Sequence, residues 1–498
     1  LKDEELKIFG EELFTHIFCT PERRAHLKEW LREANEGGFL CIKITSPVAE
    51  VHNIPFEIIY SPETGFFLRH KNISIVRDIP GLSKTVLPDK KERLNMLVIV
   101  SLPQETYERN PLNPLEELEV IYNGLKEEIA SGIIEIDVEE RANMKAIRER
   151  LSTRRYDIIH FTGHGTAGGG ILIEDEEDPR REKILDREEF ARQFALEGVR
   201  FFYFNACSTG RSLTFNPSMA FQVYRQMPQA LVLANITTVY DHTATEVAGR
   251  FYDAFLKTPV PAKAVQEARM PLGRDWWKPV LFAPSPDREV FTLPEERKKG
   301  ESKRIFNIPA ETISPYVYRY SLVREVSEVM ARGENHIALV GMGGCGKSTL
   351  ARYIARFFAG RFRNIMFFDL TREDTPEKVV ERISAEALRA GLVTAKEYKK
   401  LKGDLGQLPQ PLNIEMTIDE VFRKVEGKTF VVLDNLEGTA QDERGILRSE
   451  WDALLEALLR QNAFVLLTSR VLPYRGDRRN PLIALPIHGY SDTEFNFL

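Results

Sequence analysis

The chain has 498 residues, more than one hydrophobic core usually serves, so we expect two or more domains. Hydrophobic residues make up 43% of the chain and charged residues 29%, which is typical of a soluble globular protein. The formal net charge of −6 argues against bulk binding of nucleic acid, although a local basic patch stays compatible with it.

The chain has four cysteines: Cys19, Cys41, Cys207 and Cys345. They form no CxxC pair and have no histidine at zinc spacing, so the sequence suggests neither a disulfide framework nor a zinc site. No run of about 20 apolar residues is present, and the first residues do not resemble a signal peptide. We therefore expect a cytoplasmic protein with no membrane partner. Because the chain begins at Leu1, we expect a fragment or a processed form.

The first part of the chain predicts an α/β domain over residues 1–292. It opens with a helix near 22–34 and short apolar runs at 39–44 and 56–60. From residue 94 onward, strand and helix patterns alternate, which indicates a mostly parallel sheet with helices on both faces. The predicted strands are 94–101, 133–137, 156–161, 200–205 and 230–236, and the predicted helices are 114–130, 142–151, 186–195, 217–226 and 244–256.

A charged segment separates this pattern from a second one. Residues 293–312 include Gly300 and a basic run, with Pro294 and Pro309 at the ends of the charged stretch, which is typical of a solvated linker. The second domain is expected over 313–498. Its predicted strands are 336–341, 364–370, 429–434 and 463–469, and a helix is predicted from Lys347.

Two strands of the first domain are followed by reactive residues. His164 follows the strand in "YDIIHFTGHG", and Cys207 follows the strand in "RFFYFNAC". Ligands of open α/β sheets bind at the carboxyl ends of strands, and a single crossover separates these two strands. A thiol is mostly protonated at neutral pH, and a nearby imidazole raises its thiolate fraction or protonates a leaving amine. The alternative is that Cys207 is a packed small apolar residue.

Small residues around this pair suit an oxyanion site. The backbone N–H groups of Gly165 and Cys207 are the natural donors to a developing oxyanion. His160 lies inside the apolar strand, so we interpret it as a hydrogen-bonded core histidine, with a role as a partner of the site as the alternative.

The segments "HFTGHG" and "NACSTG" resemble the CHAT group of caspase-like cysteine peptidases, relatives of separase and the caspases. The resemblance covers residues 1–290, including "NIPFEIIYSPETGFFL", "ISIVRDIPG" and "ANITTVYDHTATEVAGRFYDAFL". It implies that His164 and Cys207 are the catalytic dyad of an endopeptidase with a protein substrate. Such families also contain inactive members, but both dyad residues are present here.

The substrate pocket is harder to predict. Related peptidases often have an acid two residues before the nucleophile, where it receives a basic side chain of the substrate. That position is Asn205 in this chain. Asp241 is a second candidate for the pocket, and its alternative role is to cap the following helix. No preference for the residue at the cleavage site follows.

The most specific motif is "GMGGCGKST", which lies between an apolar strand and a helical pattern, as a phosphate-binding loop does. Glycines let backbone N–H groups close around the β-phosphate. Lys347 is expected to reach the β- and γ-phosphates, and the Ser348 hydroxyl to bind Mg²⁺. The predicted nucleotide-binding residues of the motif are Gly341, Gly343, Gly344, Gly346, Lys347, Ser348 and Thr349.

A second motif, "KTFVVLDNLE", predicts the other side of the metal site. Asp434 is expected to hold Mg²⁺ directly or through water. Asn435 stands where hydrolases often have a second acid, and Glu437 is the nearest alternative for polarising water, so we expect slow hydrolysis and a switch. Arg470 follows the strand in "FVLLTSR" and is expected to sense the γ-phosphate; its alternative is a surface arginine.

These motifs resemble the STAND signalling NTPases of the NB-ARC type, over residues 305–498. The resemblance implies ATP with Mg²⁺ as ligands and a homo-oligomer on activation. It also implies that Arg319, in the lead-in segment, contacts the base. The segment "LPIHGYSDTEFNFL" resembles the start of a further helical subdomain, so we expect the NTPase to be incomplete at its C-terminus and an unknown trigger to be sensed outside this chain.

Together the two resemblances predict a cysteine endopeptidase gated by an ATP-dependent oligomerisation switch, in prokaryotic defence or programmed cell death. One alternative is a caspase-like scaffold without catalysis, whose assembly is driven by nucleotide. A second is a housekeeping ATPase, against which Asn435 argues. Nucleic-acid binding ranks lower, because basic and aromatic residues do not interleave.

Overall fold

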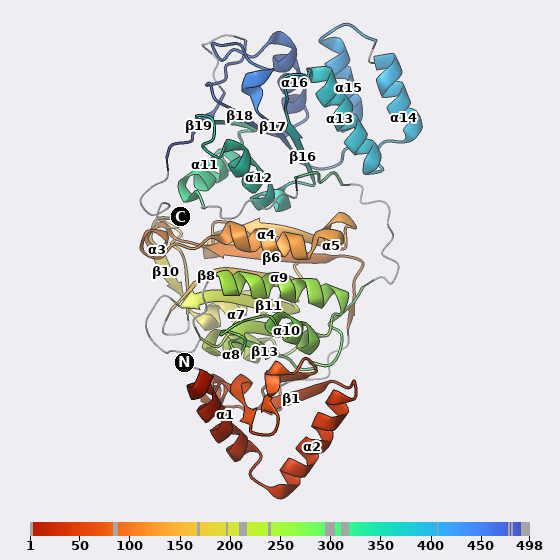
Figure 1. The fold of residues 1–498 in the computed structure, drawn as a ribbon. Helices are drawn as coiled ribbons and strands as arrows, with labels where there is room; N and C mark the ends of the chain where they lie inside the picture. Colours follow the sequence, from red (N-terminus) through yellow and green to blue (C-terminus); the bar gives the residue numbers. More distant parts are fainter. Residues whose placement is uncertain are drawn as a thin grey trace. The chain divides into compact units, whose positions relative to one another are not determined.

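The computed structural model describes residues 3–82, 88–166, 170–195, 198–208, 217–237, 241–293, 304–309, 318–405, 407–476, 479 and 482–489 (Figure 1). The chain divides into two compact units. The first comprises residues 1–129 and 133–296, and the second comprises residues 130–132 and 297–498. Most of the expected linker lies outside the described residues.

The first unit is built on one large sheet, and along its main row of strands, from β1 to β7, neighbours are parallel except where β12 meets β13. β9 (Ile171–Glu174) pairs antiparallel with β8 and with β10 (Glu182–Leu185). The strand order is β1 (Leu40–Thr45), β4 (Ile73–Asp78), β13 (Pro279–Phe282), β12 (Leu231–Asn235), β11 (Phe201–Ser208), β8 (Ile158–Gly165), β6 (Leu94–Ser101) and β7 (Ile134–Glu139). The predicted mostly parallel α/β sheet is therefore confirmed.

Helices cover both faces of this sheet, because successive side chains of a buried strand point to opposite faces. Phe161 and Phe202 contact Phe190 of α7, whereas Phe201 and Tyr203 contact Phe251 of α9. The helices of the unit are α1 (Asp3–Ile17), α2 (Pro21–Asn35), α3 (Gln104–Arg109), α4 (Pro114–Gly124), α5 (Lys126–Ala130), α6 (Met144–Thr153), α7 (Arg187–Ala195), α8 (Pro217–Gln226), α9 (Asp241–Lys257) and α10 (Pro261–Arg269).

The helix predicted over 114–130 is two helices, α4 and α5, because the first ends at Gly124. α4 packs closely on α9, and glycines permit the approach (Figure 1). A Cβ atom at Gly124 would lie 2.8 Å from the carbonyl oxygen of Gly249. A Cβ atom at Gly249 would lie 2.0 Å from Cγ1 of Val120. A side chain at Gly124 would therefore push α4 away from α9, and a side chain at Gly249 would displace the side chain of Val120.

A buried ion pair joins the N-terminal segment to strand β4. Glu57 and Arg77 are both fully buried, and Arg77 donates two hydrogen bonds of 2.8 Å to the two carboxylate oxygens. Arg77 also donates to the carbonyl oxygen of Ile54 at 2.9 Å. Burial raises the pKa of Glu57, and the charge of Arg77 opposes that rise. The pair therefore depends on both partners, since removal of either would leave the other charge buried without its directly bonded partner.

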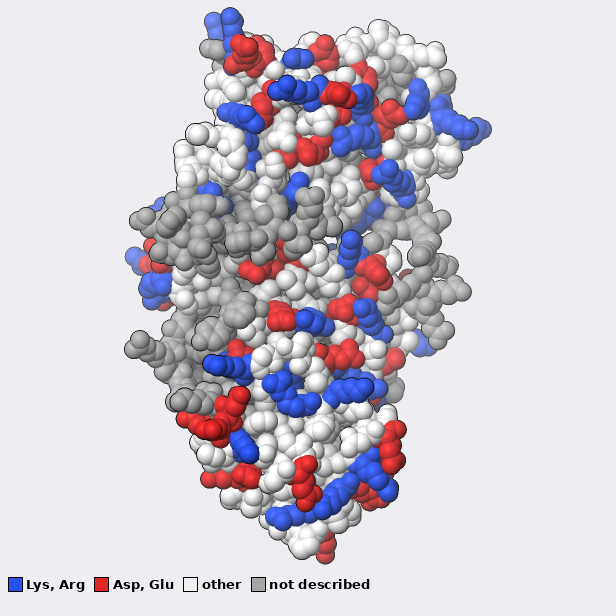
Figure 2. Space-filling view, in the orientation of Figure 1, with Lys and Arg blue, Asp and Glu red and all other residues white. Residues whose placement is uncertain are grey.

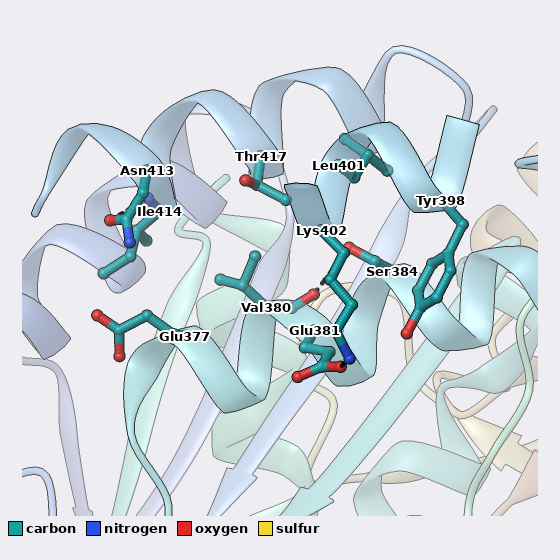
Figure 3. Close-up of a pocket in the computed structure, with 10 residues that line it drawn as sticks. All are labelled: Glu377, Val380, Glu381, Ser384, Tyr398, Leu401, Lys402, Asn413, Ile414 and Thr417. Atoms are coloured by element: carbon teal, nitrogen blue, oxygen red, sulfur yellow. Dashed lines mark hydrogen bonds and ion pairs between the residues drawn. The ribbon is translucent and has the colours of Figure 1, made fainter. Parts of the chain in front are cut away.

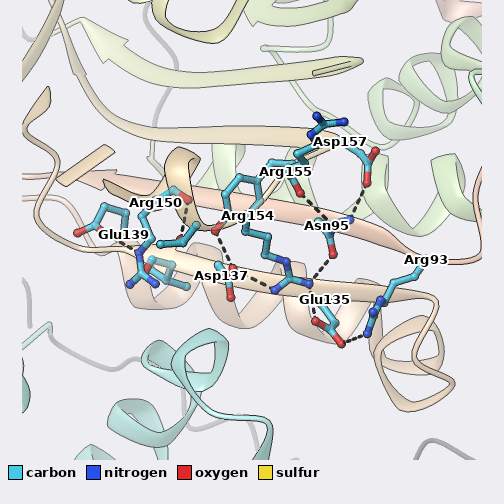
Figure 4. Close-up of polar contacts among 12 residues, drawn as sticks. Arg93, Asn95, Glu135, Asp137, Glu139, Arg150, Arg154, Arg155 and Asp157 are labelled. Atoms are coloured by element: carbon cyan, nitrogen blue, oxygen red, sulfur yellow. Dashed lines mark hydrogen bonds and ion pairs between the residues drawn. The ribbon is translucent and has the colours of Figure 1, made fainter. Parts of the chain in front are cut away.

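Strand β7 lies at one edge of this sheet in the described part of the chain, and one of its faces is acidic, with Asp137 and Glu139 buried and Glu135 half-buried. Glu135, Asp137 and Glu139 alternate along the strand. Arg154 contacts Glu135 and donates to Asp137 at 3.1 Å, while Arg150 donates to Glu139 at 2.7 Å (Figure 4). The result is a charged ladder that runs the length of the edge strand.

The second unit contains a smaller sheet in which every neighbouring pair of strands is parallel. Its order is β16 (Asn364–Asp369), β17 (Thr429–Asp434), β18 (Phe464–Ser469), β15 (His336–Val340) and β19 (Ala484–Pro486). Its helices are α11 (Tyr320–Ala331), α12 (Lys347–Phe357), α13 (Pro376–Arg389), α14 (Ala395–Lys400), α15 (Leu412–Phe422) and α16 (Ser449–Arg460). A separate parallel α/β domain in this part of the chain confirms the second predicted sheet.

Charged side chains of both signs are mixed over the described surface (Figure 2). Within the described segments, no helix combines the length and the apolar composition needed to cross a membrane.

Candidate active site and nucleotide-binding site

The structure brings His164 and Cys207 together in adjacent strands. β8 and β11 are parallel neighbours, and their register pairs His164 directly with Cys207. Neighbouring strands lie about 4.8 Å apart. Both residues lie inside their strands, which run further than the sequence predicts, to Gly165 and Ser208. His164 is fully buried, and the side chain of Cys207 lies outside the described residues.

The backbone around His164 is tightly enclosed. Gly165, a predicted oxyanion donor, ends β8 and pairs with Ile171 of β9 and with Ser208 of β11. A Cβ atom at Gly163 would lie 2.6 Å from the carbonyl oxygen of Ser101 in β6. Only a residue without a side chain therefore fits at position 163, which faces β6 and directly precedes His164.

We expect Gly163→Ala to destabilise the first unit by about 1–3 kcal/mol, because the added methyl group must displace β6 or β8. The measurement is thermal unfolding of the full chain by scanning calorimetry, with Gly273→Ala as the control, since a Cβ atom at Gly273 meets nothing within 4 Å. Equal melting temperatures for the two variants would contradict the close approach.

A buried polar cluster lies one row below the dyad on the same two strands. Asn205 is paired with Thr162 in the register and is 4% exposed. Its side-chain amide donates to Glu117 of α4, and the amide of Asn235 donates to Asn205 at 3.4 Å. Thr162 donates to the other oxygen of Glu117 at 2.5 Å. The predicted pocket residue Asn205 is thus engaged inside the protein.

His160 is a hydrogen-bonded core histidine, and a carboxylate is one of its partners. Its Nε2 atom lies 2.8 Å from Glu117, and its Nδ1 atom lies 3.0 Å from the hydroxyl of Tyr252. Burial, followed by Tyr203 and Glu117, raises the pKa of Tyr252 well above its usual value, so this hydroxyl keeps its proton. Asp241, the other predicted pocket residue, begins α9, and its side chain lies outside the described residues.

Glu117 has no counterpart among the sequence predictions. It sits in a helix rich in acids, where Glu116 next to it is exposed and looks the same in the sequence. One signal was available: Glu117 is four residues before the apolar Ile121, on the helix face that is buried. That periodicity could have identified it as a buried acid in need of partners.

The phosphate-binding motif forms a loop between β15 and α12, as predicted. Gly344 and Gly346 have φ angles of +81° and +87°, in the left-handed region that favours glycine. The ammonium group of Lys347 donates to the carbonyl oxygens of Gly341 at 3.0 Å and Met342 at 2.9 Å. A hollow beside the loop is lined by Gly341, Met342, Gly343, Gly344, Cys345, Val340, Arg319 and residues 486–489.

The residues expected to hold Mg²⁺ lie together. Ser348 donates to Oδ1 of Asp434 at 3.0 Å, and Thr468 donates to the same oxygen at 2.5 Å. Oδ2 of Asp434 is buried and has no hydrogen-bond partner among the described residues. Burial raises the pKa of Asp434, whereas the bonds from Thr468 and Ser348 lower it. A hydroxyl and a carboxylate oxygen left without a donor fit a hard divalent cation.

The residue after Asp434, where hydrolases often have a second acid, is Asn435, and its side chain has a partner in this structure. Asn435, in the left-handed region at φ 68°, donates through its side chain to Asp369 at 2.8 Å. Arg470 forms an ion pair with Glu437, with Nε and Oε1 2.8 Å apart. A Cβ atom at Gly343 would lie 3.2 Å from Cζ of Arg470, so this arginine lies against the phosphate-binding loop.

Arg319 is one of the residues that line the hollow beside the phosphate-binding loop. It is mostly buried, immediately precedes α11 and donates to the carbonyl oxygen of His488 at 2.8 Å. Because it lines the hollow together with the loop glycines, its position is compatible with the predicted contact to a base.

We expect Lys347→Ala to weaken binding of ATP about 10- to 100-fold, because a charge-assisted hydrogen bond contributes about 1.5–3 kcal/mol. Fluorescent ATP analogues titrated with the full chain give the affinity. Lys396→Ala removes an exposed lysine of α14 and serves as the control. Equal affinities for the two variants would exclude Lys347 from nucleotide binding.

Another hollow lies among α13, α14 and α15, away from the residues that the motifs single out (Figure 3). Its wall includes Val380, Leu401 and Ile414, and an ion pair between Glu381 and Lys402 lies at its margin. None of its lining residues belongs to the dyad or to the phosphate-binding loop.

Models of two known domain families match the segments of the chain that contain these sites. A model of the CHAT domain matches residues 24–277, half of the chain, which include both dyad residues. The chain belongs to the CHAT family. A model of the NB-ARC domain matches residues 320–470, which include the phosphate-binding loop, Asp434 and Arg470. This CHAT protein therefore joins a protease-like domain to a nucleotide-dependent switch.

No curated protein matches the chain. Two crystal structures of the separase–securin complex of Saccharomyces cerevisiae match part of it, with 15% and 14% sequence identity and TM-scores of 0.30 and 0.31. Each match covers 49% of the CHAT protein and about 15% or 16% of the other chain. The CHAT protein thus spans only a small part of the length of those chains.

Proposed function

We propose that this CHAT protein is a cysteine endopeptidase with a His164–Cys207 dyad, gated by ATP-dependent assembly through its NB-ARC domain. The observation that carries the proposal is the register of β8 and β11, which pairs these two residues directly. The CHAT match across both residues supports it, since CHAT is a caspase-like peptidase family.

The chemistry of the proposed dyad needs no further group. His164 takes the proton of the Cys207 thiol, and the thiolate forms a bond to the carbonyl carbon of a substrate peptide. The C–N bond then breaks as His164 returns the proton to the leaving amine. Water, deprotonated by His164, displaces the thiolate and releases the acid. The backbone N–H groups of Gly165 and Cys207 are proposed to stabilise the oxyanion in both steps.

The NB-ARC domain is proposed to bind ATP with Mg²⁺. The Ser348 hydroxyl and Asp434 carboxylate would hold the cation, and Lys347 would exchange its bonds to loop carbonyls for phosphate oxygens. When bound, the cation neutralises phosphate charge. Asn435 bonds to Asp369 and is no base, which supports slow hydrolysis and a switch. Arg470, beside Gly343, is proposed to sense the γ-phosphate, and Arg319 to contact the base.

The proposed cellular role follows from the combination of domains. NB-ARC domains typically assemble, so we propose a homo-oligomer on activation, with an unknown trigger sensed outside this chain and a protein as the substrate of the CHAT domain. A protease-like domain joined to such a switch suits prokaryotic defence or programmed cell death in the cytoplasm. This assignment rests on analogy between domain combinations.

The test is cleavage of proteins in a whole-cell lysate by the full chain, with and without ATP and Mg²⁺. Cys207→Ala removes the proposed nucleophile, and Lys347→Ala removes the proposed phosphate contact. Cys19→Ala, which removes an exposed cysteine, is the matched control. Mass spectrometry of new termini identifies the substrate and the residue at the cleavage site.

Cleavage that needs Cys207 and ATP, and that is lost with Lys347→Ala, is the expected result. ATP-driven assembly without any Cys207-dependent cleavage would contradict the proposal and favour a scaffold. Rapid ATP turnover without assembly would favour a housekeeping ATPase.

A further inference from the structure

We infer that Glu117 is a positioning residue for the proposed dyad: its carboxylate ties β8 to β11 directly below the row that holds His164 and Cys207. This inference rests on the proposed function of that pair. Glu117 comes from α4, outside both strands, so it links the two dyad-bearing strands through a third element.

The first observation is the number of bonds that Glu117 accepts. Oε2 accepts from the Thr162 hydroxyl at 2.5 Å, and Oε1 accepts from the Asn205 amide and from His160, whose Nε2 atom lies 2.8 Å away. Glu117 itself is 2% exposed. A buried carboxylate that accepts this many hydrogen bonds fixes the positions of its donors. Because it has so little contact with solvent, it cannot itself bind a substrate.

The second observation is where these partners lie. Thr162 precedes His164 by two residues, and Asn205 precedes Cys207 by two residues. Residues two apart in a strand share a face, at a rise of about 3.3 Å per residue. The register pairs Thr162 with Asn205 and His164 with Cys207. The carboxylate therefore bridges the two strands about 7 Å from the dyad row.

The third observation is that all three neighbours of the carboxylate can donate. A carboxylate only accepts hydrogen bonds, and it faces the Thr162 hydroxyl, the Asn205 amide and Nε2 of His160, which lies 2.8 Å from Oε1. An amide in place of the carboxylate would direct N–H groups at one of these donors and break part of the bridge.

A substitution of nearly equal shape therefore tests the role. Glu117→Gln keeps the volume of the side chain and removes an acceptor, and Thr162→Val removes one bond only. Glu139→Gln is the matched control: it changes another buried carboxylate, bonded to Arg150, on the edge strand β7.

The first measurement is the rate of Cys207 alkylation by iodoacetamide in the full chain, at pH values from 5 to 10, followed by peptide mass spectrometry. Cys19 is exposed and gives the reference rate. Burial raises the pKa of the Cys41 thiol to about 12, so Cys41 reports unfolding when it reacts.

In the unsubstituted chain we expect the alkylation rate of Cys207 to reach half of its maximum at a pH below the usual thiol pKa of about 8.5. Glu117→Gln should lower the Cys207 rate at pH 7 at least tenfold and move the midpoint toward 8.5. Thr162→Val should cause a smaller change in the same direction, and Glu139→Gln no change. Cys41 should stay unmodified in all variants.

The second measurement is hydrogen exchange of the amides in 158–165 and 201–208, which we expect to speed up in Glu117→Gln and not in Glu139→Gln. Unchanged alkylation and unchanged exchange in Glu117→Gln would overturn the inference. If His164 and Cys207 do not form a dyad, His164→Ala should leave the alkylation rate of Cys207 unchanged. That result would separate failure of the proposed function from failure of this inference. The exchange data would still decide whether Glu117 holds the two strands together.

Discussion

Alanine at His164 is expected to lower kcat/KM for peptide-bond cleavage by about 10²- to 10⁴-fold, the usual contribution of a positioned acid–base group. The reason is the register: His164 is the residue of β8 that lies opposite Cys207. In the proposed mechanism, the substitution removes the group that takes the thiol proton and returns it to the leaving amine. The substrate for the measurement is the protein that the lysate experiment identifies.

His70→Ala is the control for this comparison. His70 lies in the same unit and bonds through its ring to the carbonyl oxygen of Thr64 at 2.9 Å, but it belongs to neither dyad strand. Its loss should change kcat/KM less than twofold. A similar loss for both histidines would mean that general destabilisation, and not proton transfer, explains the effect of His164→Ala.

The second large effect concerns stability. Arg77→Met should destabilise the first unit by about 3–5 kcal/mol, because it leaves the fully buried carboxylate of Glu57 without its two-bond partner. Burial already raises the pKa of Glu57, and the positive charge of Arg77 is the strongest influence that opposes it. Loss of that charge therefore disfavours the ionised carboxylate further.

Scanning calorimetry of the full chain measures this effect as a shift of the transition of the first unit. The double variant Glu57→Leu with Arg77→Met should recover most of the loss, since an apolar pair replaces both charges. Recovery should fall short by at least about 1 kcal/mol, because the carbonyl oxygen of Ile54 loses a donor and the buried Arg269 loses the nearby charge of Glu57. A double variant as unstable as the single one would show that the ion pair is not the source of the effect.

The sequence predicts best where local chemistry has few alternatives. The phosphate-binding loop needs glycines at Gly344 and Gly346 for backbone reasons, and both adopt positive φ angles. The buried strands of both sheets are continuous apolar runs, and they appear near the predicted residues. The neighbouring positions of the strands that end near His164 and Cys207 agree with the single crossover that the sequence predicts between them.

Features that depend on distant partners were harder to predict. The antiparallel pairing of β12 with β13 cannot be read from either segment, because both look like buried strands. The helix α1 lies at the start of the chain and was not predicted, since few of its residues are buried. Glu117 was also hard to predict, because its role depends on hydrogen bonds to residues between 43 and 88 positions away in the sequence. These residues are His160, Thr162 and Asn205.

The charged ladder along β7 gains importance once many copies of the chain are held side by side. An open strand edge is a template on which another chain can add its own strand, and crowding copies together raises the rate of such additions. Side chains of Glu135, Asp137 and Glu139, held by Arg150 and Arg154, place charge along this edge strand. Charged side chains on an edge strand disfavour pairing with another chain, so the ladder opposes the addition of a strand from a neighbouring copy.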